Sequence, residues 1–209
     1  NEKNLLKIIE SIDDISKEVF LKNKLDFGCG KELIIFEVIK KSIYSIVKNE
    51  ILDVSKGAKI KIIALEKELN CFLENKKWKF PVKVRGIVDR IDNRNGTIRI
   101  IDYKTGAVRS SELILRDMDS VFDEQKTKSM QLLCYSLMFL KTHKNYKKIQ
   151  AGLLCFRDLK KGLIKLNLKK SGKVSEFDIA KEEILSFEKK LKLLISKILN
   201  PKTNFRTKD

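Results

Sequence analysis

The sequence lacks the run of about 20 apolar residues that a membrane-spanning helix requires, and it has no N-terminal signal peptide. It also lacks internal repeats and low-complexity tracts. Apolar residues nevertheless make up 43% of the 209 residues, which is enough for a substantial core. We therefore expect a folded chain that has no membrane partner.

The sequence also lacks the C-x-x-C spacing of metal and redox sites. Its four cysteines are scattered, at Cys29, Cys71, Cys134 and Cys155. Cys134 and Cys155 lie in apolar runs, as thiols of a core do. We expect all four to be reduced, which favours a cytoplasmic location.

Acidic residues are few relative to basic ones. There are 28 Asp and Glu against 45 Lys and Arg, which gives a formal net charge of +17. Such an excess repels itself, and its usual reason is a polyanionic partner. Codon usage in an AT-rich genome, which enriches lysine, is the alternative explanation. The charge therefore favours a nucleic-acid partner without identifying one.

The spacing of apolar residues predicts interspersed helices and strands. The expected helices cover 3–22, about 31–52, 129–142 and about 176–199, and the expected strands cover 60–72, 80–92, 97–104, 149–157 and 163–169. Because the central strands are joined as hairpins, we expect an α/β (α+β) fold whose central mixed β-sheet carries helices on both faces. We expect one domain over residues 1–209 with a core at about 31–169. Since the chain begins at Asn1, we expect a fragment of a longer protein.

Two further expectations concern connections. Residues 107–128 are polar with few apolar anchors, which predicts a long connection that is mobile or ordered only with ligand. Ser175 and Asp178 have the spacing of a capping box, which predicts that the last helix begins near residue 176.

The most informative segment is residues 86–106, which read GIVDRIDNRNGTIRIIDYKTG. Asn95-Gly96 favours a two-residue hairpin turn, which places Asp89 directly opposite Asp102. A four-residue loop would leave the two aspartates diagonal on one face, and a three-residue loop would place them on opposite faces. Lys104 follows Asp102 by two residues and therefore shares its face.

Two facing carboxylates must share a proton or bind a cation. Oxygen ligands suit Mg²⁺ or Mn²⁺, and the backbone carbonyl of Tyr103 is available as a third ligand because its ring points the other way. An ammonium such as that of Lys104 can orient an attacking water or offset charge on a phosphoryl oxygen. The alternative is an exposed strand face with a solvated Asp–Lys pair.

The longer pattern G-x-x-D-R-x-D, turn, apolar strand, D-Y-K-T-G resembles the nuclease domain of the RecB/AddB family, within the PD-(D/E)XK superfamily. The resemblance implies a restriction-endonuclease-like core. It also implies that Asp89 and Asp102 are metal ligands and that Lys104 is the catalytic lysine. Gln131 and Tyr135 match the family's Q-x-x-x-Y motif and share one helix face. They are expected to support DNA binding or the lysine, or alternatively to be buried polar residues satisfied by the backbone.

Arg90 and Asp92 complete the D-R-x-D pattern, and an ion pair with a neighbouring arginine is the expected role of Asp92. Glu66 is expected either to support the metal or to be an exposed charge. Relatives usually carry a histidine before the first strand, whereas the only histidine here, His143, follows the third predicted helix. Glu32, Glu37 or a residue before Asn1 could replace it. The resemblance also implies a comparison with AddB-like members, which often hold an iron–sulphur cluster on four cysteines, three of them near the C-terminus. No cysteine follows Cys155 here, so no iron–sulphur cluster is expected in this chain, either because the cluster is absent or because the tail was left out.

These features predict a Mg²⁺- or Mn²⁺-dependent deoxyribonuclease domain. By resemblance it would process single-stranded DNA or duplex ends in double-strand-break repair, with a helicase subunit or a fused helicase-like region as its partner. Two alternatives remain open: a catalytically inactive DNA-binding scaffold of a helicase–nuclease complex, and a nuclease that acts on RNA or invading DNA.

Overall fold

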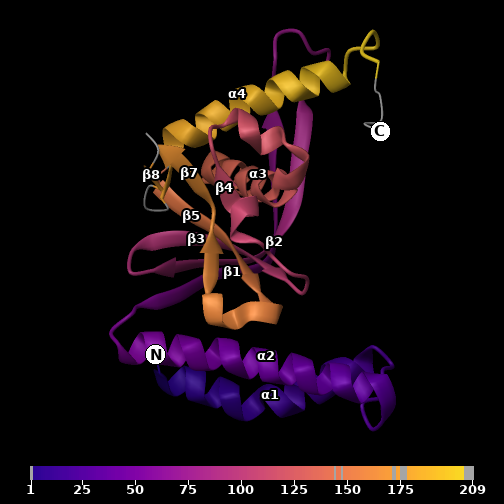
Figure 1. The fold of residues 1–209 in the computed structure, drawn as a ribbon, viewed down its shortest axis with the longest axis vertical. Helices are drawn as coiled ribbons and strands as arrows, with labels where there is room; N and C mark the ends of the chain where they lie inside the picture. Colours follow the sequence, from indigo (N-terminus) through magenta and orange to yellow (C-terminus); the bar gives the residue numbers. More distant parts are fainter. Residues whose placement is uncertain (1, 144, 147, 171–172, 175–177, 205–209) are drawn as a thin grey trace.

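The computed structural model describes residues 2–143, 145–146, 148–170, 173–174 and 178–204. Four α-helices and nine strands are assigned in these ranges (Figure 1). The helices are α1 (Glu2–Lys22), α2 (Gly30–Ser55), α3 (Thr127–Thr142) and α4 (Lys181–Ile198). The strands are β1 (Ile60–Leu73), β2 (Val82–Arg94), β3 (Thr97–Lys104), β4 (Ile114–Leu115), β5 (Lys148–Cys155), β6 (Leu163–Lys165), β7 (Asn167–Lys170), β8 (Lys173–Val174) and β9 (Ile179–Ala180).

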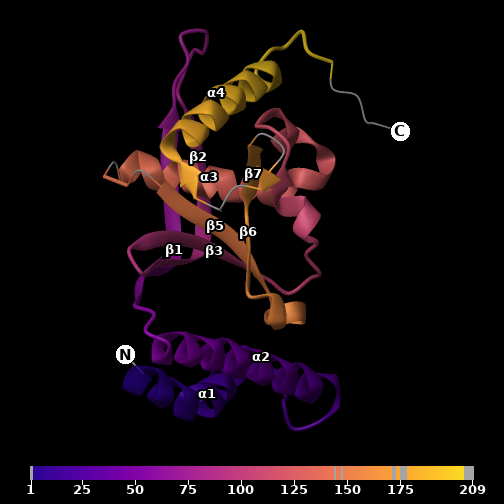
Figure 2. The ribbon, with the colours of Figure 1, turned by 60° about the vertical axis from the view of Figure 1, so that its left-hand side comes forward.

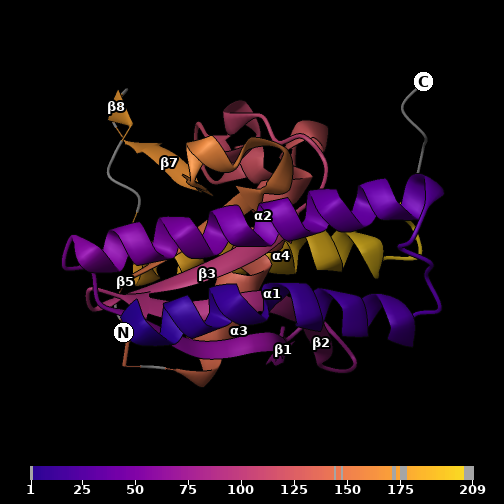
Figure 3. The ribbon, with the colours of Figure 1, turned by 90° about the horizontal axis from the view of Figure 1, so that it is seen from below.

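The central sheet has the strand order β1-β2-β3-β5-β6, and β9 pairs with β5. Only the β3–β5 pair within it is parallel, so the sheet is mixed and mostly antiparallel, as predicted. In Figures 1 and 2, α1 and α2 lie below the sheet, and α3 and α4 lie above it. Figure 3 shows α1 and α2 side by side from below. The predicted fold, a central sheet flanked by helices on both faces, is confirmed.

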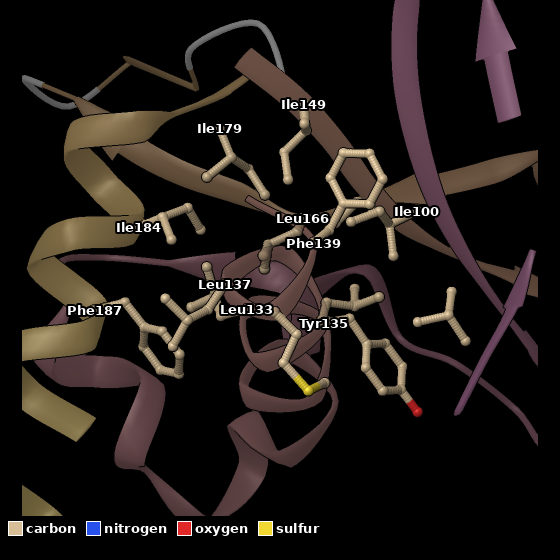
Figure 4. Close-up of a cluster of buried hydrophobic side chains, with 14 of the residues drawn as sticks. Ile100, Leu133, Tyr135, Leu137, Phe139, Ile149, Leu166, Ile179, Ile184 and Phe187 are labelled. Carbon is tan, nitrogen blue, oxygen red and sulfur yellow. The ribbon is translucent and has the colours of Figure 1, made fainter. Parts of the chain in front are cut away.

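The main core lies between the sheet and α3. Nine of the 16 residues of α3 are buried, because the helix packs against strands and against α4. Figure 4 shows this cluster, in which Leu133, Leu137 and Phe139 of α3 meet strand and α4 side chains. The cluster includes Ile100, Ile149, Ile184 and Phe187. Burial on this scale fixes α3, and with it the polar residues of the same helix.

The α1–α2 pair packs through fewer apolar residues than the sequence predicts. Phe20 and Phe36 meet edge to face, with ring centroids 5.0 Å apart. Ile8 and Ile15 belong to the apolar pattern of the first helix, yet they are 44% and 54% exposed. Periodicity therefore located these helices correctly, although part of their apolar pattern is exposed. No helix in the described ranges is both long enough and apolar enough to cross a membrane.

The expectation that residues 107–128 have few apolar anchors was wrong. The segment contains three short 3₁₀ helices and β4, and its apolar residues enter the core: Val108, Leu113, Leu115, Met118 and Val121. Lys126 Nζ donates to the carbonyl of Ile114 at 2.8 Å, and Ser129 Oγ donates to that of Glu112 at 2.6 Å. Tertiary contacts therefore order the segment, although its apolar residues follow no regular period.

The predicted start of the last helix was also wrong. The helix begins at Lys181, and Ser175 lies outside the described residues. Asp178 does not cap a helix, because its Oδ1 accepts a hydrogen bond from Gln150 Nε2 at 3.0 Å. Glu183 accepts a hydrogen bond from the backbone N–H of Ala180 instead, at 2.7 Å.

Candidate active site

The β2–β3 hairpin has the predicted two-residue turn. Asn95 and Gly96 both have positive φ, at 52° and 88°, as a type I′ turn requires. The observed pairs include Arg94 with Thr97 and Arg90 with Ile101. The register that places Asp89 and Asp102 at facing positions is therefore confirmed.

The two strands separate where the aspartates meet. The β2–β3 ladder ends at the pair Arg90–Ile101, and β3 continues beside β5 as far as Lys104. At the opening, the backbone N–H of Tyr103 donates to Asp89 Oδ2 at 2.6 Å. The N–H and C=O of one strand residue point to the same side, so the Tyr103 carbonyl is directed to the same opening. The point at which β2 and β3 stop pairing is called the fork below. The sequence predicted the residues that meet there but not the separation of the strands.

One amide joins Asp102 to Lys104. Gln131 Nε2 donates to Asp102 Oδ1 at 3.1 Å, and Gln131 Oε1 accepts from Lys104 Nζ at 3.0 Å. Lys104 Nζ also lies 2.8 Å from Asp102 Oδ2. The side chains of β3 and α3 thus form one connected group on the face predicted for them.

Tyr135 anchors this group from the next turn of α3. Its hydroxyl accepts a hydrogen bond from Gln131 Nε2 at 2.8 Å, and in Figure 4 it points away from the apolar cluster. Its ring lies against Gly86, where an added Cβ would come within 2.7 Å of Tyr135 Cε1. Burial raises the pKa of the Tyr135 phenol above its usual value. Half-buried Gln131 therefore contacts both the lysine and the aspartate, and buried Tyr135 holds it from below, against a glycine on β2.

The environment of Asp102 favours a nearby cation. The residue is 4% exposed, and burial raises the pKa of its carboxyl, while Lys104 acts in the opposite direction. The charge of Asp89 raises that pKa further. Among the described residues, Oδ2 of Asp102 has its ion pair with Lys104 but no hydrogen bond of good geometry. A hard cation at this oxygen would offset both burial and repulsion.

The donor set fits such a cation. The available oxygens are those of Asp89, Asp102 and the Tyr103 carbonyl, a combination that suits Mg²⁺ or Mn²⁺ with several waters retained. No group of three or more His, Cys, Asp or Glu residues is close enough to hold a metal in the ranges described above. Any metal here would therefore depend on two carboxylates and the backbone.

A buried charge network supports the opposite face of the hairpin. Asp92 is fully buried and accepts from Arg90 at 2.8 Å and from Arg99 at 2.7 Å, which confirms its predicted ion pair. Glu50 of α2 lies 2.5 Å from Arg90. The ring of Tyr103 is on this side too, stacked on Phe156 at 5.6 Å. Sequence reasoning missed Glu50, because nothing local links a helix residue to this strand. It also missed Arg99, although the predicted two-residue turn places Arg99 directly opposite Asp92.

His143, Glu32 and Glu37 lie on helices or at a helix end, away from the strands that carry the aspartates, whereas Glu66 lies on β1 at the position that faces Asp89. His143 is exposed at the end of α3 and stacks on Phe139 at 4.3 Å. Glu37 forms an ion pair with Lys40 at 3.0 Å, and Glu32 is half-buried. Glu66 is exposed on β1, between the partners of Val88 and Arg90, with φ of 46°.

All four cysteines are free, as expected. Cys71 and Cys155 are buried, Cys29 is exposed, and burial raises the pKa of Cys134 to about 12. The buried and half-buried thiols, those of Cys71, Cys134 and Cys155, are inert packing groups.

Comparison with known proteins identifies the family. No curated protein matches the chain. The family model described as the PD-(D/E)XK nuclease superfamily matches residues 12–209, which include the whole sheet, α3 and the two aspartates. Members of this superfamily are typically metal-dependent nucleases. The chain belongs to the PD-(D/E)XK nuclease superfamily.

Proposed function

We propose that this chain is a Mg²⁺- or Mn²⁺-dependent deoxyribonuclease domain of the RecB/AddB type that hydrolyses phosphodiester bonds. The observation that carries the proposal is the hydrogen-bonded group of Asp102, Lys104 and Gln131 beside Asp89. A solvated Asp–Lys pair on an exposed strand would need no amide to hold both side chains.

Asp89, Asp102 and the Tyr103 carbonyl would hold the metal. A bound divalent ion supplies Lewis-acid chemistry, by activating water and polarising the scissile phosphate. Asp89 is fixed for this role by its bond to the Tyr103 N–H at 2.6 Å. Asp102 is fixed through Oδ1, which accepts the Gln131 amide. Its Oδ2 is left beside the Lys104 ammonium and would be free to bind the metal.

Lys104 is the proposed catalytic residue next to the metal ligands. Its ammonium is held by Gln131 Oε1, so its direction is set before substrate arrives. From there it would position the attacking water or offset charge on the phosphoryl oxygen. Gln131 and Tyr135 are positioning residues, since their polar atoms are already used within the protein.

The wider role follows from the family resemblance and the charge. A net charge of +17 favours binding to the nucleic-acid backbone with strong salt dependence. We propose that the substrate is single-stranded DNA or a duplex end, in double-strand-break repair. The proposed partner is a helicase subunit or a fused helicase-like region, and the proposed location is the cytoplasm.

The test is cleavage of a labelled DNA oligonucleotide by wild type, Asp102→Ala and the exposed control Asp14→Ala. Wild type and Asp14→Ala should cut with Mg²⁺ or Mn²⁺ and stop with chelator, and Asp102→Ala should not cut. Equal residual cutting by wild type and Asp102→Ala would contradict the proposal, because it indicates contamination. Binding without cutting would favour the scaffold, and an RNA oligonucleotide run in parallel separates the DNA and RNA alternatives.

A further inference from the structure

β1 and β2 continue past the fork as a two-stranded ribbon that reaches the end of the molecule where α4 lies (Figures 1 and 2). Trp78, in the turn of the ribbon, donates to Ser196 of α4 at 2.9 Å. This contact and the core residues of β1 and β2 fix one face of the ribbon. The other face is open to solvent.

The open face ends beside the active site. Alternation along β2 places Lys83, Arg85 and Ile87 on one strand face, and all three are exposed. Gly86 lies on the opposite face, against Tyr135 of α3. Asp89 follows Ile87 by two residues and is half-buried at the fork, where it accepts the Tyr103 N–H. With a rise of about 3.3 Å per residue, Lys83 lies about 20 Å along the strand from Asp89.

Aromatic side chains lie on this ribbon. Phe72 pairs with Lys83 across the strands and is 57% exposed. Phe80, just before β2, is 58% exposed. Within the described part of the chain these are the exposed aromatic residues, although exposure of a phenylalanine costs stability unless something covers it.

The ribbon is also basic. Residues 70–85 contain five basic residues, Lys76, Lys77, Lys79, Lys83 and Arg85, against the single acid Glu74. No ion pair engages any of these five cations in the portion of the chain that the structure describes. Two exposed acidic residues of β1, Glu66 and Glu68, lie at the end nearest the site, where Glu68 is paired with Ile87. Positive charge therefore dominates away from the proposed metal site.

We propose that the open face of the ribbon binds single-stranded nucleic acid and holds it beside the fork that carries Asp89. A base would stack on Phe72, and phosphates would contact Lys83 and Arg85. Stacking on an aromatic ring requires an unpaired base, whereas cations alone would accept duplex equally well. The inference rests on the proposed function and adds the surface and the strandedness of its substrate.

Fluorescence anisotropy with a labelled oligothymidine in chelator tests this surface without cleavage. Phe72→Ala should weaken binding about 5- to 150-fold, the range for loss of one base–aromatic stack. Phe72→Tyr should restore binding, and Phe72→Leu should not. An oligonucleotide with abasic positions should remove the difference between wild type and Phe72→Ala. The matched control is Leu21→Ala, because Leu21 is 65% exposed on α1.

The cations are tested by the salt dependence of the same binding. The double variant Lys83→Ala/Arg85→Ala should reduce the slope of log K against log salt by about 1.4, or about 0.7 per phosphate contact. Lys3→Ala/Lys7→Ala removes the same charge from α1, where both residues are exposed, and should leave the slope nearly unchanged.

Wild-type affinity in Phe72→Ala, or wild-type affinity in Phe72→Leu, would overturn the inference. So would a duplex that binds as tightly as the single strand and depends equally on Phe72. Cleavage is scored separately with Mn²⁺. If Phe72→Ala cuts as fast as wild type, only the proposed binding surface is overturned. If binding depends on Phe72 but wild type does not cut, the surface is supported and the proposed nuclease activity is contradicted.

Discussion

Asp89 takes the place of a strand partner for Tyr103, because its carboxylate accepts the Tyr103 N–H at the point where the β2–β3 ladder ends. The bond holds the fork open and places a carboxylate, a backbone carbonyl and Asp102 around one space. A regular ladder would fill this space with backbone hydrogen bonds. The site is therefore a consequence of where two strands stop pairing.

Replacement of Gln131 tests its role as a positioning residue. Gln131→Ala removes the group that orients both Lys104 and Asp102. We expect activity to fall about 10- to 100-fold, as for partners of metal ligands generally, with little change in DNA affinity. Steady-state cleavage kinetics beside anisotropy measure the two effects. Gln125→Ala, an exposed glutamine just before α3, should be neutral, and equal losses in both variants would contradict the assignment.

Replacement of Gly86 tests the contact between β2 and α3. The Cβ of Gly86→Ala would lie 2.7 Å from Tyr135 Cε1, so the ring and its hydrogen bond to Gln131 must shift. We expect the free energy of unfolding to fall by about 1–3 kcal/mol through overpacking, and cleavage to fall with it. Gly106→Ala has no heavy atom within 4 Å and should cost much less in urea denaturation.

Replacement of Asp92 tests the buried charges under α2. Asp92→Ala leaves Arg90 and Arg99 without their shared partner. We expect a loss of about 3–5 kcal/mol in the free energy of unfolding. Asp53→Ala breaks the nearby half-exposed pair with Arg94 and should cost less than about 1 kcal/mol. Similar values for the two variants would show that burial does not decide the cost.

The pH dependence of stability can be tested at Glu188. Burial opposes its ionisation, but hydrogen bonds from Lys141 and Lys192 outweigh that effect and lower the pKa of Glu188 below its usual 4.5. A carboxyl whose pKa is lower in the folded state adds stability above the unfolded pKa, and this stability is lost as pH falls through the folded pKa.

Glu188→Gln should therefore be less stable than wild type at pH 7, by about 1–3 kcal/mol, and the gap should narrow on acidification below pH 4.5. Thermal or urea unfolding from pH 7 to pH 3 measures the gap. Glu10→Gln, an exposed residue of α1, serves as the control. If the difference in stability between wild type and Glu188→Gln instead widens as the pH falls, the lowered pKa of Glu188 is not its cause.

Local signals in the sequence were sufficient to predict the hairpin and the strand face that its charged residues share. Asn95-Gly96 determines the turn, the turn determines the register, and alternation then places Lys104 with Asp102. The spacing of Gln131 and Tyr135 likewise gave one helix face, and the structure directs that face to Asp102.

The remaining features depend on contacts between distant segments. The packing of residues 107–128 follows from apolar residues without a period, such as Leu113 and Val121. The predicted start of α4 was wrong because Asp178 accepts a hydrogen bond from Gln150 of β5 and does not cap the helix. The pairing of Glu50 with Arg90 joins α2 to β2 across 40 residues, and neither segment carries a signal of it.

The central claim is that Asp89, Asp102 and the Tyr103 carbonyl hold a divalent cation. The most direct measurement is the anomalous difference density of crystals soaked in Mn²⁺, for wild type and for Asp102→Ala. We predict a peak between the two carboxylates beside the Tyr103 carbonyl in wild type, and its loss in Asp102→Ala. Cleavage-competent wild-type crystals without Mn²⁺ at these oxygens, or an unchanged peak in Asp102→Ala, would contradict the claim.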